Sequence, residues 1–297
     1  MPDASIEGLP ADLVALDGGI ESELNDWFRV WWNERLRQFD LVGPDDEIEE
    51  LELSSFEEEI LSMARARWPL SHAERLVHAV FSWDSDWQGN FVDRMSPLLI
   101  NGRISGIRFV LAKAGYRLPD DFSLRNEFVA GVRSHARSVA MQMMRTQHDW
   151  LGTAIDDVKA WWIEDYGSLA GLNRNNIASR LQRLEAYRRS WHVPLTGWSE
   201  AAWAFNQGIR DFLENNDPNA RVRVMPEDAS DPARDHPPAC ILFAGEWFEY
   251  GELPLFPVHP NCVHYIGDFR FSLGAGFKPA LDLGADELYM TSVLESV

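Results

Sequence analysis

The segment from Phe122 to Asp165 restricts the fold most, because it is the longest stretch of helical periodicity in the chain. It contains no proline and only two glycines, Gly131 and Gly152. Apolar side chains recur along it at the spacing of one helix face, from Phe128 to Trp162. The pattern predicts one long bent helix, or two helices joined near Gly152.

Other segments show the same periodicity and are predicted to be helices. Prolines and glycines are expected to interrupt or separate them, among them Pro97 and the pair Pro194 and Gly197. The predicted segments are Glu21 to Phe39, Asp46 to Trp68, a helix capped by Ser71 that runs to Phe81, Ile104 to Ala114, Asn173 to about Trp191, and Ser199 to Asn215.

The hydrophobic period changes only after Asp217. Arg221 to Met225 alternates like a strand, and Asp268 to Leu273 could form another. Between them, the Cys/His hub, Asp235 to Ile266, contains both cysteines, three of the eight histidines and five prolines, so no long helix runs through it. The sequence therefore predicts a mainly α chain with a small C-terminal α+β module.

Four regions are expected along the chain. They are an acidic, tryptophan-rich helical region (1–120), a long-helix body (121–217), a strand and loop module with the Cys/His hub (218–273) and a C-terminal tail (274–297). Most of the thirteen tryptophans fall on predicted helices, which indicates core or interface positions.

The charge is concentrated near the N-terminus. The formal net charge is −20, and residues 1–60 account for −15 of it. A surface this negative repels phosphate, so direct contact of this region with duplex DNA is not expected. The region is either a solvated acidic face or an arm that docks on a basic partner. No run approaches the roughly 18 apolar residues of a membrane helix, and no secretion signal is recognisable. We therefore expect synthesis in a cytoplasm and no membrane partner.

The Cys/His hub contains candidate zinc ligands. Cys262 and His264 are two residues apart and would face the same side of a strand. Cys240 could supply a third ligand, and His236 or His259 the fourth of a tetrahedral site. Two alternatives stay open: the cysteines could be buried small apolar residues, or they could form a disulfide after release from the cell.

A catalytic role for the hub is less well supported by the sequence. Cys262 near His259 and His264 could form a nucleophile and its base, but no orienting third residue has a recognisable context. Motifs of serine hydrolases, phosphate-binding loops, dinucleotide-binding folds and zinc proteases do not occur. We therefore expect no enzymatic activity and assign no catalytic residue.

The hub and its neighbours resemble the C-terminal signature of the minor head protein family of tailed bacteriophages, which includes the Mu F protein and the SPP1 head morphogenesis protein. The resemblance covers roughly residues 165 to 270. The family's two paired cysteine motifs are incomplete here, because Phe243 stands at one cysteine position and His264 at another. The matching pieces are Val222 to Met225, Pro238 to Cys240, Ala244 to Trp247, Leu253-Pro254, His259 to Cys262, Gly171 to Asn173, and Ala202 to Gly208 with Asn206, where the family has a helix ending in asparagine and glycine.

The resemblance implies a structural protein of a virion, assembled in the cytoplasm of a bacterial host. Family members are associated with the portal vertex, where several copies join the portal and other head or neck proteins, and act in head assembly and DNA delivery. At most one structural zinc ion is implied. Two alternatives stay open: a zinc- or cysteine-dependent enzyme packaged in the virion, such as an ADP-ribosyltransferase or a peptidase, and a prophage-derived interaction module.

Overall fold

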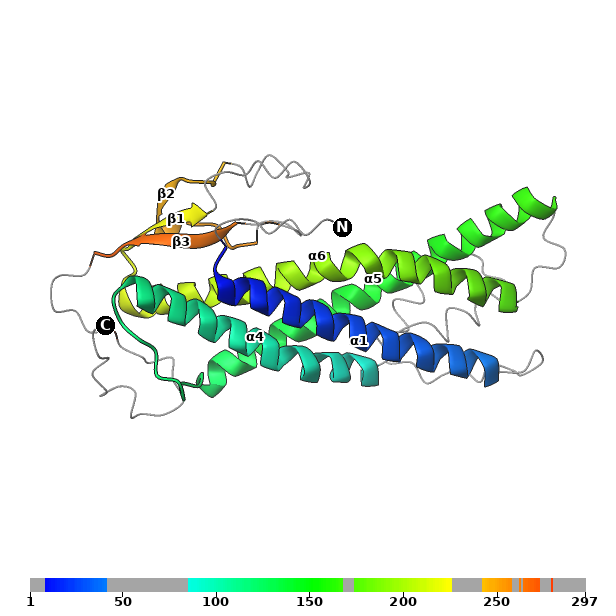
Figure 1. The fold of residues 1–297 in the computed structure, drawn as a ribbon, viewed down its shortest axis with the longest axis horizontal. Coiled ribbons are helices and arrows are strands. Elements are labelled where there is room, and N and C mark those ends of the chain that lie inside the picture. The colour runs from blue at the N-terminus through cyan, green and yellow to red at the C-terminus, as the bar shows by residue number, and fades with distance from the viewer. Residues whose placement is uncertain are drawn as a thin grey trace. The chain divides into compact units, whose positions relative to one another are not determined.

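A computed structural model describes residues 9–41, 85–167, 174–225, 242–257, 262, 264–272 and 279. Most of these residues are helical, and the described strands come after the last helix, so the predicted fold class is confirmed. In chain order the described elements are α1 (Ala11–Leu41), α4 (Ser85–Lys113), α5 (Asn126–Tyr166), α6 (Arg174–Asn216), β1 (Arg221–Met225), β2 (Trp247–Glu249), the short 3-10 helix η1 (Tyr250–Glu252) and β3 (Tyr265–Arg270) (Figure 1). The helices predicted at 46–68 and 71–81 lie outside the described residues.

Two helices are longer than predicted because they continue through proline. Helix α4 contains Pro97, and α6 contains Pro194, where a break between two helices was expected. Each proline removes one backbone hydrogen bond, which disfavours a helix. The buried side chains of Met95 and Leu99 flank the first proline, and Val193 and Trp198 flank the second. Packing of these apolar stripes outweighs the local cost of the prolines.

The other helices differ less from the prediction. Helix α5 is a single helix that passes through Gly152, which decides between the two predicted arrangements. Helix α1 begins ten residues earlier than expected, since Leu13 and Ile20 are fully buried and extend its apolar stripe. Strand β1 has the predicted bounds, whereas β3 begins at Tyr265 and ends at Arg270, three residues ahead of the predicted strand.

The chain forms two compact units, each built from separate segments. Unit 1 contains Met1–Glu23, Met95–Arg133 and Val193–Val297, and unit 2 contains Leu24–Arg94 and Ser134–His192. Each of the four described long helices therefore contributes one part to each unit. The four contiguous regions expected from the sequence stay a prediction.

Unit 1 contains a three-stranded antiparallel sheet in the order β2-β1-β3 (Figure 1). One face of the sheet is apolar, and Val222, Val224 and Ile266 on it are fully buried. This face packs on helices, since the ring of Phe269, the cross-strand partner of Val222, lies 6.1 Å from that of Phe109 in α4, which lies 5.3 Å from that of Phe205 in α6. The core of unit 1 therefore lies between the sheet and these two helices.

Helices α4 and α6 approach each other at glycines in unit 1. A Cβ atom at Gly106 would lie 2.0 Å from the carbonyl oxygen of Phe205, and one at Gly208 would lie 1.9 Å from that of Arg103. Both distances are too short for any side chain. The two backbones are thus in direct contact, which only glycine allows at these positions.

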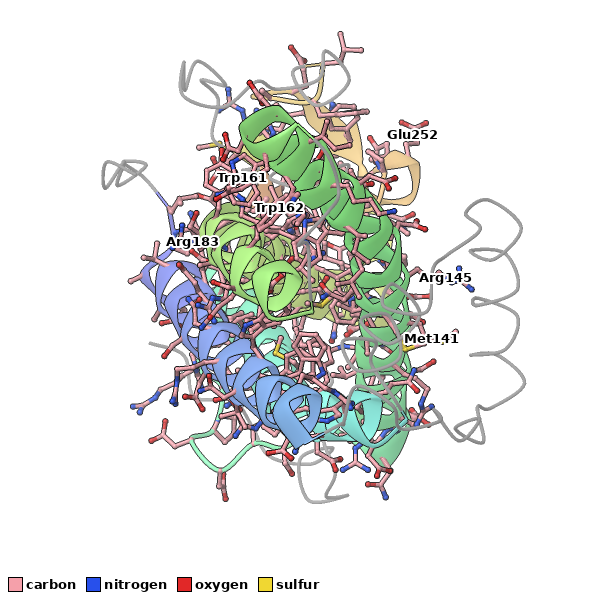
Figure 2. The ribbon with its side chains drawn as sticks, turned by 90° about the vertical axis from the view of Figure 1, so that its right-hand side faces the viewer. Met141, Arg145, Trp161, Trp162, Arg183 and Glu252 are labelled. Atoms are coloured by element: carbon pink, nitrogen blue, oxygen red, sulfur yellow. The ribbon has the colours of Figure 1, made fainter. Side chains whose placement is uncertain are left out.

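Aromatic side chains form much of the core of unit 2. Trp27 stacks on Trp31 with ring centroids 6.5 Å apart, and it meets Phe91 of α4 edge to face at 5.4 Å. In α5, Trp161 and Trp162 contact each other (Figure 2). Arg183 of α6, labelled in the same view, is exposed. The tryptophans of α1 are thus core residues, in line with the sequence pattern. None of the described helices has the length and apolar character needed to cross a bilayer.

Candidate functional site

One face of α6 fastens the C-terminal module through side chains that bind backbone atoms. The first is Trp198, whose indole N–H donates a 2.6 Å hydrogen bond to the carbonyl oxygen of Cys262. This bond is buried, and Trp198 is nearly inaccessible to solvent. The segment that precedes β3 is therefore held against the helix.

Asn206 lies two turns farther along α6 and holds β3 itself. Its side-chain N–H donates to the carbonyl oxygen of Ala202 at 2.8 Å, and its oxygen accepts from the backbone N–H of Ile266 at 2.9 Å. The first bond orients the amide, and the second satisfies a buried strand donor that would otherwise cost free energy. Helix α6 continues past Asn206 and Gly208 to Asn216, one residue beyond the end predicted at Asn215.

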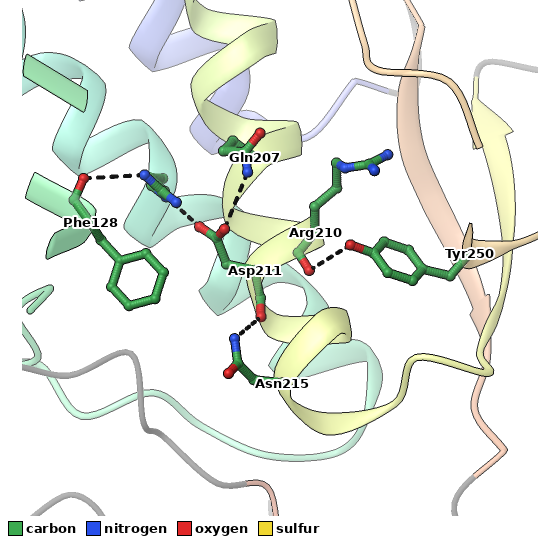
Figure 3. Close-up of polar contacts among 7 residues, drawn as sticks. Phe128, Gln207, Arg210, Asp211, Asn215 and Tyr250 are labelled. Atoms are coloured by element: carbon green, nitrogen blue, oxygen red, sulfur yellow. Dashed lines mark hydrogen bonds and ion pairs between the residues drawn. The ribbon is translucent and has the colours of Figure 1, made fainter. Parts of the chain in front are cut away.

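Arg210 and Tyr250 connect α6 to η1 in both directions. The Tyr250 hydroxyl donates to the carbonyl oxygen of Arg210 at 3.2 Å (Figure 3). The Arg210 guanidinium donates to the carbonyl oxygen of Leu253, the residue after η1, also at 3.2 Å. The guanidinium also lies 5.2 Å from the centre of the Tyr250 ring. Burial is the main cause that raises the pKa of Tyr250 above its usual value, so the hydroxyl stays a donor at neutral pH.

These three α6 residues, hereafter the α6 clasp (Trp198, Asn206 and Arg210), share one side of the helix. An α-helix turns about 100° per residue, so their side chains lie within about 120° of one another. Farther along the chain, Asp217 accepts hydrogen bonds from the backbone N–H of Ser272, at 2.7 Å, and from its hydroxyl. The module is therefore attached before, within and after β3, twice to α6 and once to the residue that follows α6.

A buried ion pair supports the helix that carries the α6 clasp. Arg103 of α4 donates from Nε to the carboxylate of Asp211, and from Nη1 to the carbonyl oxygen of Phe128 at 3.2 Å (Figure 3). Gln207 donates to the other carboxylate oxygen at 3.2 Å. Both charges of the pair are thus hydrogen-bonded, as a buried ion pair requires.

Two of the predicted zinc ligands come together in the structure. Cys262 and His264 are both fully buried, and the Cys262 Sγ atom lies 3.6 Å from Nδ1 of His264. Tetrahedral zinc with usual Zn–S and Zn–N distances of about 2.3 and 2.0 Å would place the two ligand atoms about 3.5 Å apart. The pair therefore has the separation of two zinc ligands, and equally that of a thiol hydrogen-bonded to an imidazole. The Cys262 thiol is not in a disulfide.

The other predicted ligands, Cys240, His236 and His259, lie outside the described residues. Within the described part of the chain, no group of three or more histidine, cysteine, aspartate or glutamate side chains is arranged to hold a metal ion. Phe243 contacts the rings of Phe248 and Phe256, with centroids 5.7 and 6.1 Å apart. This position is used for apolar packing.

Most residues of the site could not be recognised from the sequence. Helical periodicity singled out neither the clasp residues nor Arg103 and Asp211, because a buried polar residue interrupts the apolar pattern that the periodicity measures. Only Asn206 was marked, by the resemblance to the phage family. Comparison of the chain with protein-family models, with curated proteins and with solved structures gives no match.

Proposed function

We propose that this chain is a structural minor head or neck protein of a tailed bacteriophage, which acts at the portal vertex in head assembly and DNA delivery. The observation that carries the proposal is a set of hydrogen bonds between side chains of α6 and the backbone of the C-terminal module. Trp198, Asn206 and Arg210 each bind a backbone atom of the segments that resemble the phage signature. These hydrogen bonds fix the conformation of the module, and a subunit that bridges other proteins needs a surface of fixed conformation.

The burial of Cys262 also favours a structural role for the hub. A cysteine nucleophile has to meet its substrate, and thiol reactivity goes with a partly exposed, electropositive environment. The Cys262 side chain is fully buried and lies beside His264. The alternative functions, an enzyme packaged in the virion or a prophage-derived module, are outcomes of the same experiment.

Electron microscopy of phage particles tests the proposal. Particles are induced from the bacterium that carries this gene and are labelled with an antibody against the chain. We expect label at a single vertex of each head, where the portal lies. Particles that assemble and package DNA without any label would overturn the proposal, and protein retained in the cell without particles would indicate the prophage-derived module.

We also propose that Cys262 and His264 are two ligands of one structural zinc ion, completed by Cys240 and by His236 or His259. Their 3.6 Å separation supports this, and thiolate and imidazole are preferred zinc donors. The ion would tie the segment before β3 to another part of the hub and stabilise a module that has little core of its own.

Elemental analysis of the purified full chain tests the zinc site. We expect about one zinc ion per chain, as one four-ligand site holds. The substitution Cys262→Ser should remove the ion, and His135→Ala, a half-buried histidine of unit 2, should retain it. A folded, metal-free wild-type protein would contradict the zinc proposal and leave the virion proposal standing.

A further inference from the structure

The outward face of the sheet carries charged and aromatic side chains that the α6 clasp does not use. Val222 and Val224 of β1 are buried, so the alternate residues of β1 point away from the helices. Arg221 has Glu249 of β2 and Arg270 of β3 as its cross-strand partners, and Arg223 has Trp247 and Asp268. These side chains form two adjacent rows across the three strands.

The carboxylates on this face already have cations and leave two arginines, of which Arg223 donates from Nε to the carbonyl oxygen of Gly245 at 2.7 Å. Glu249 forms an ion pair with Arg221 at 3.3 Å, and Asp268 forms one with Lys113 of α4 at 3.2 Å. Arg270 is exposed, and no described residue is hydrogen-bonded or ion-paired to its guanidinium. That guanidinium lies 4.1 Å from the centre of the Trp247 ring. Stacking holds the planar group in place and leaves its N–H donors available at its edge.

The arrangement of the arginines calls for an anionic group on the sheet. Arg221 and Arg270 are directly opposite each other on neighbouring strands, and like charges in that position are destabilising. A carboxylate or a phosphate placed between them would reverse the sign of this interaction. Arg223 lies two residues from Arg221 on the same face and adds a third positive charge.

The charges around the arginines favour a protein over a nucleic acid as the source of that anion. Glu249 and Asp268 stand on the same face. A nucleic acid backbone carries closely and evenly spaced negative charges, which these two carboxylates repel. A protein segment can place carboxylates opposite the arginines and other groups elsewhere. Tryptophan and arginine are also the residues most enriched at the centres of protein interfaces.

We propose that Arg221, Arg223, Trp247 and Arg270 form a docking surface for a protein segment that presents carboxylates. Arg270, stacked on Trp247, is its anchor and binds one carboxylate through two N–H donors. The proposal goes beyond the virion assignment and does not depend on it, because it rests only on the outward face of the sheet.

Fluorescence polarisation with the full chain tests this surface. The probes are a labelled glutamate-rich peptide, the same peptide with glutamine in place of glutamate, and a labelled oligothymidylate of equal charge. At low ionic strength we expect the glutamate peptide to bind and the other two to bind more weakly. Arg270→Gln should weaken binding of the glutamate peptide about tenfold, the effect of losing one charge-assisted pair. Arg270→Lys should restore only part of it, because lysine lacks the planar fork.

Arg183→Gln serves as the matched control, because it removes the same charge from an exposed position on α6 in unit 2. Circular dichroism establishes that each variant is folded. The proposal is overturned by tighter binding of the oligothymidylate, by equal losses in the Arg270 and Arg183 variants, or by no binding of the glutamate peptide. Labelling of phage particles is a separate measurement, so either proposal can fail alone.

Discussion

At the scale of single residues, Glu185 is a buried group whose charge state changes near neutral pH. It lies on α6 in unit 2 and is only 3% exposed. Arg188, one turn away, is 3.7 Å from its carboxylate and also bonds to Gln147 of α5. Burial raises the pKa of Glu185 to about 7, and the neighbouring arginines only partly oppose this rise. The carboxyl group is thus partly protonated at neutral pH.

The raised pKa of Glu185 predicts a pH dependence of stability. Between its usual value of 4.5 and about 7, the folded state keeps a proton that the unfolded state has lost. The contribution of this group to the unfolding free energy is therefore complete at low pH and is lost as the pH rises through 7, by roughly 3 kcal/mol in total. Urea unfolding at pH 5 and pH 8 measures this loss.

The substitution Glu185→Gln should remove this contribution, so that the variant loses less stability than the wild type between the two pH values. Glu164→Gln is the control, because Glu164 is an exposed residue of α5 in the same unit. Identical pH dependence in the wild type and the Glu185 variant would show that this carboxyl ionises as freely in the folded state as in the unfolded state.

Asn206 provides a second prediction at the residue scale. Asn206→Ala leaves the buried N–H of Ile266 without its acceptor, which should cost about 1–3 kcal/mol of unfolding free energy. Amide hydrogen exchange at Ile266 should become faster as β3 loosens. Asn215→Ala is matched to it, since Asn215 is exposed and its side chain, among the described residues, bonds to a carbonyl of its own helix. Comparable losses in the two variants would argue against the role of Asn206 in holding β3.

At the scale of elements, the crossing of α4 and α6 positions the helix that carries the α6 clasp. Gly106 and Gly208 let the two backbones touch, and the ion pair between Arg103 and Asp211 fixes the contact nearby. Any side chain at either glycine would have to push one helix away from the other. The crossing therefore depends on the absence of side chains as much as on the polar pair.

Gly208→Ala should accordingly destabilise unit 1. Its new Cβ would lie 1.9 Å from the carbonyl oxygen of Arg103, so we expect a loss of about 1–3 kcal/mol or more, as for other overpacked sites. Gly89→Ala places the same methyl group on an exposed stretch of α4, where no described residue beyond its chain neighbours and the adjoining helix backbone comes within 4 Å of it. That variant should gain about 0.5–1 kcal/mol from the better helix propensity of alanine. Chemical denaturation compares the two, and a neutral Gly208 variant would disprove the close crossing.

At the scale of the whole molecule, the charge of −20 should make stability depend on salt. Repulsion among like charges destabilises the compact state, and added ions screen it. We expect the melting temperature to rise as sodium chloride is increased from low to physiological concentration and then to level off. Differential scanning fluorimetry measures this. A melting temperature that falls steadily with salt would indicate that attractive ion pairs outweigh the repulsion.

The sequence predicted some elements of the structure better than others. Apolar periodicity predicted α5 and the class of the fold, because a continuous buried helix face requires apolar residues at regular spacing in the sequence. It failed at Pro97 and Pro194, where local propensity opposed the helix and burial of the neighbouring side chains prevailed. Cys262 and His264 lie 3.6 Å apart, as expected for residues two apart that face one side, whereas their role as zinc ligands stays a prediction.

The order of residues alone determined a mainly helical chain with a strand-rich C-terminal module, since hydrophobic period depends only on neighbours in the sequence. Tertiary structure decided which polar residues meet. Trp198 and Cys262 are 64 residues apart, and Arg103 and Asp211 are 108 apart. No local pattern encodes such pairs, because each partner becomes recognisable only when folding places it beside the other in a buried environment.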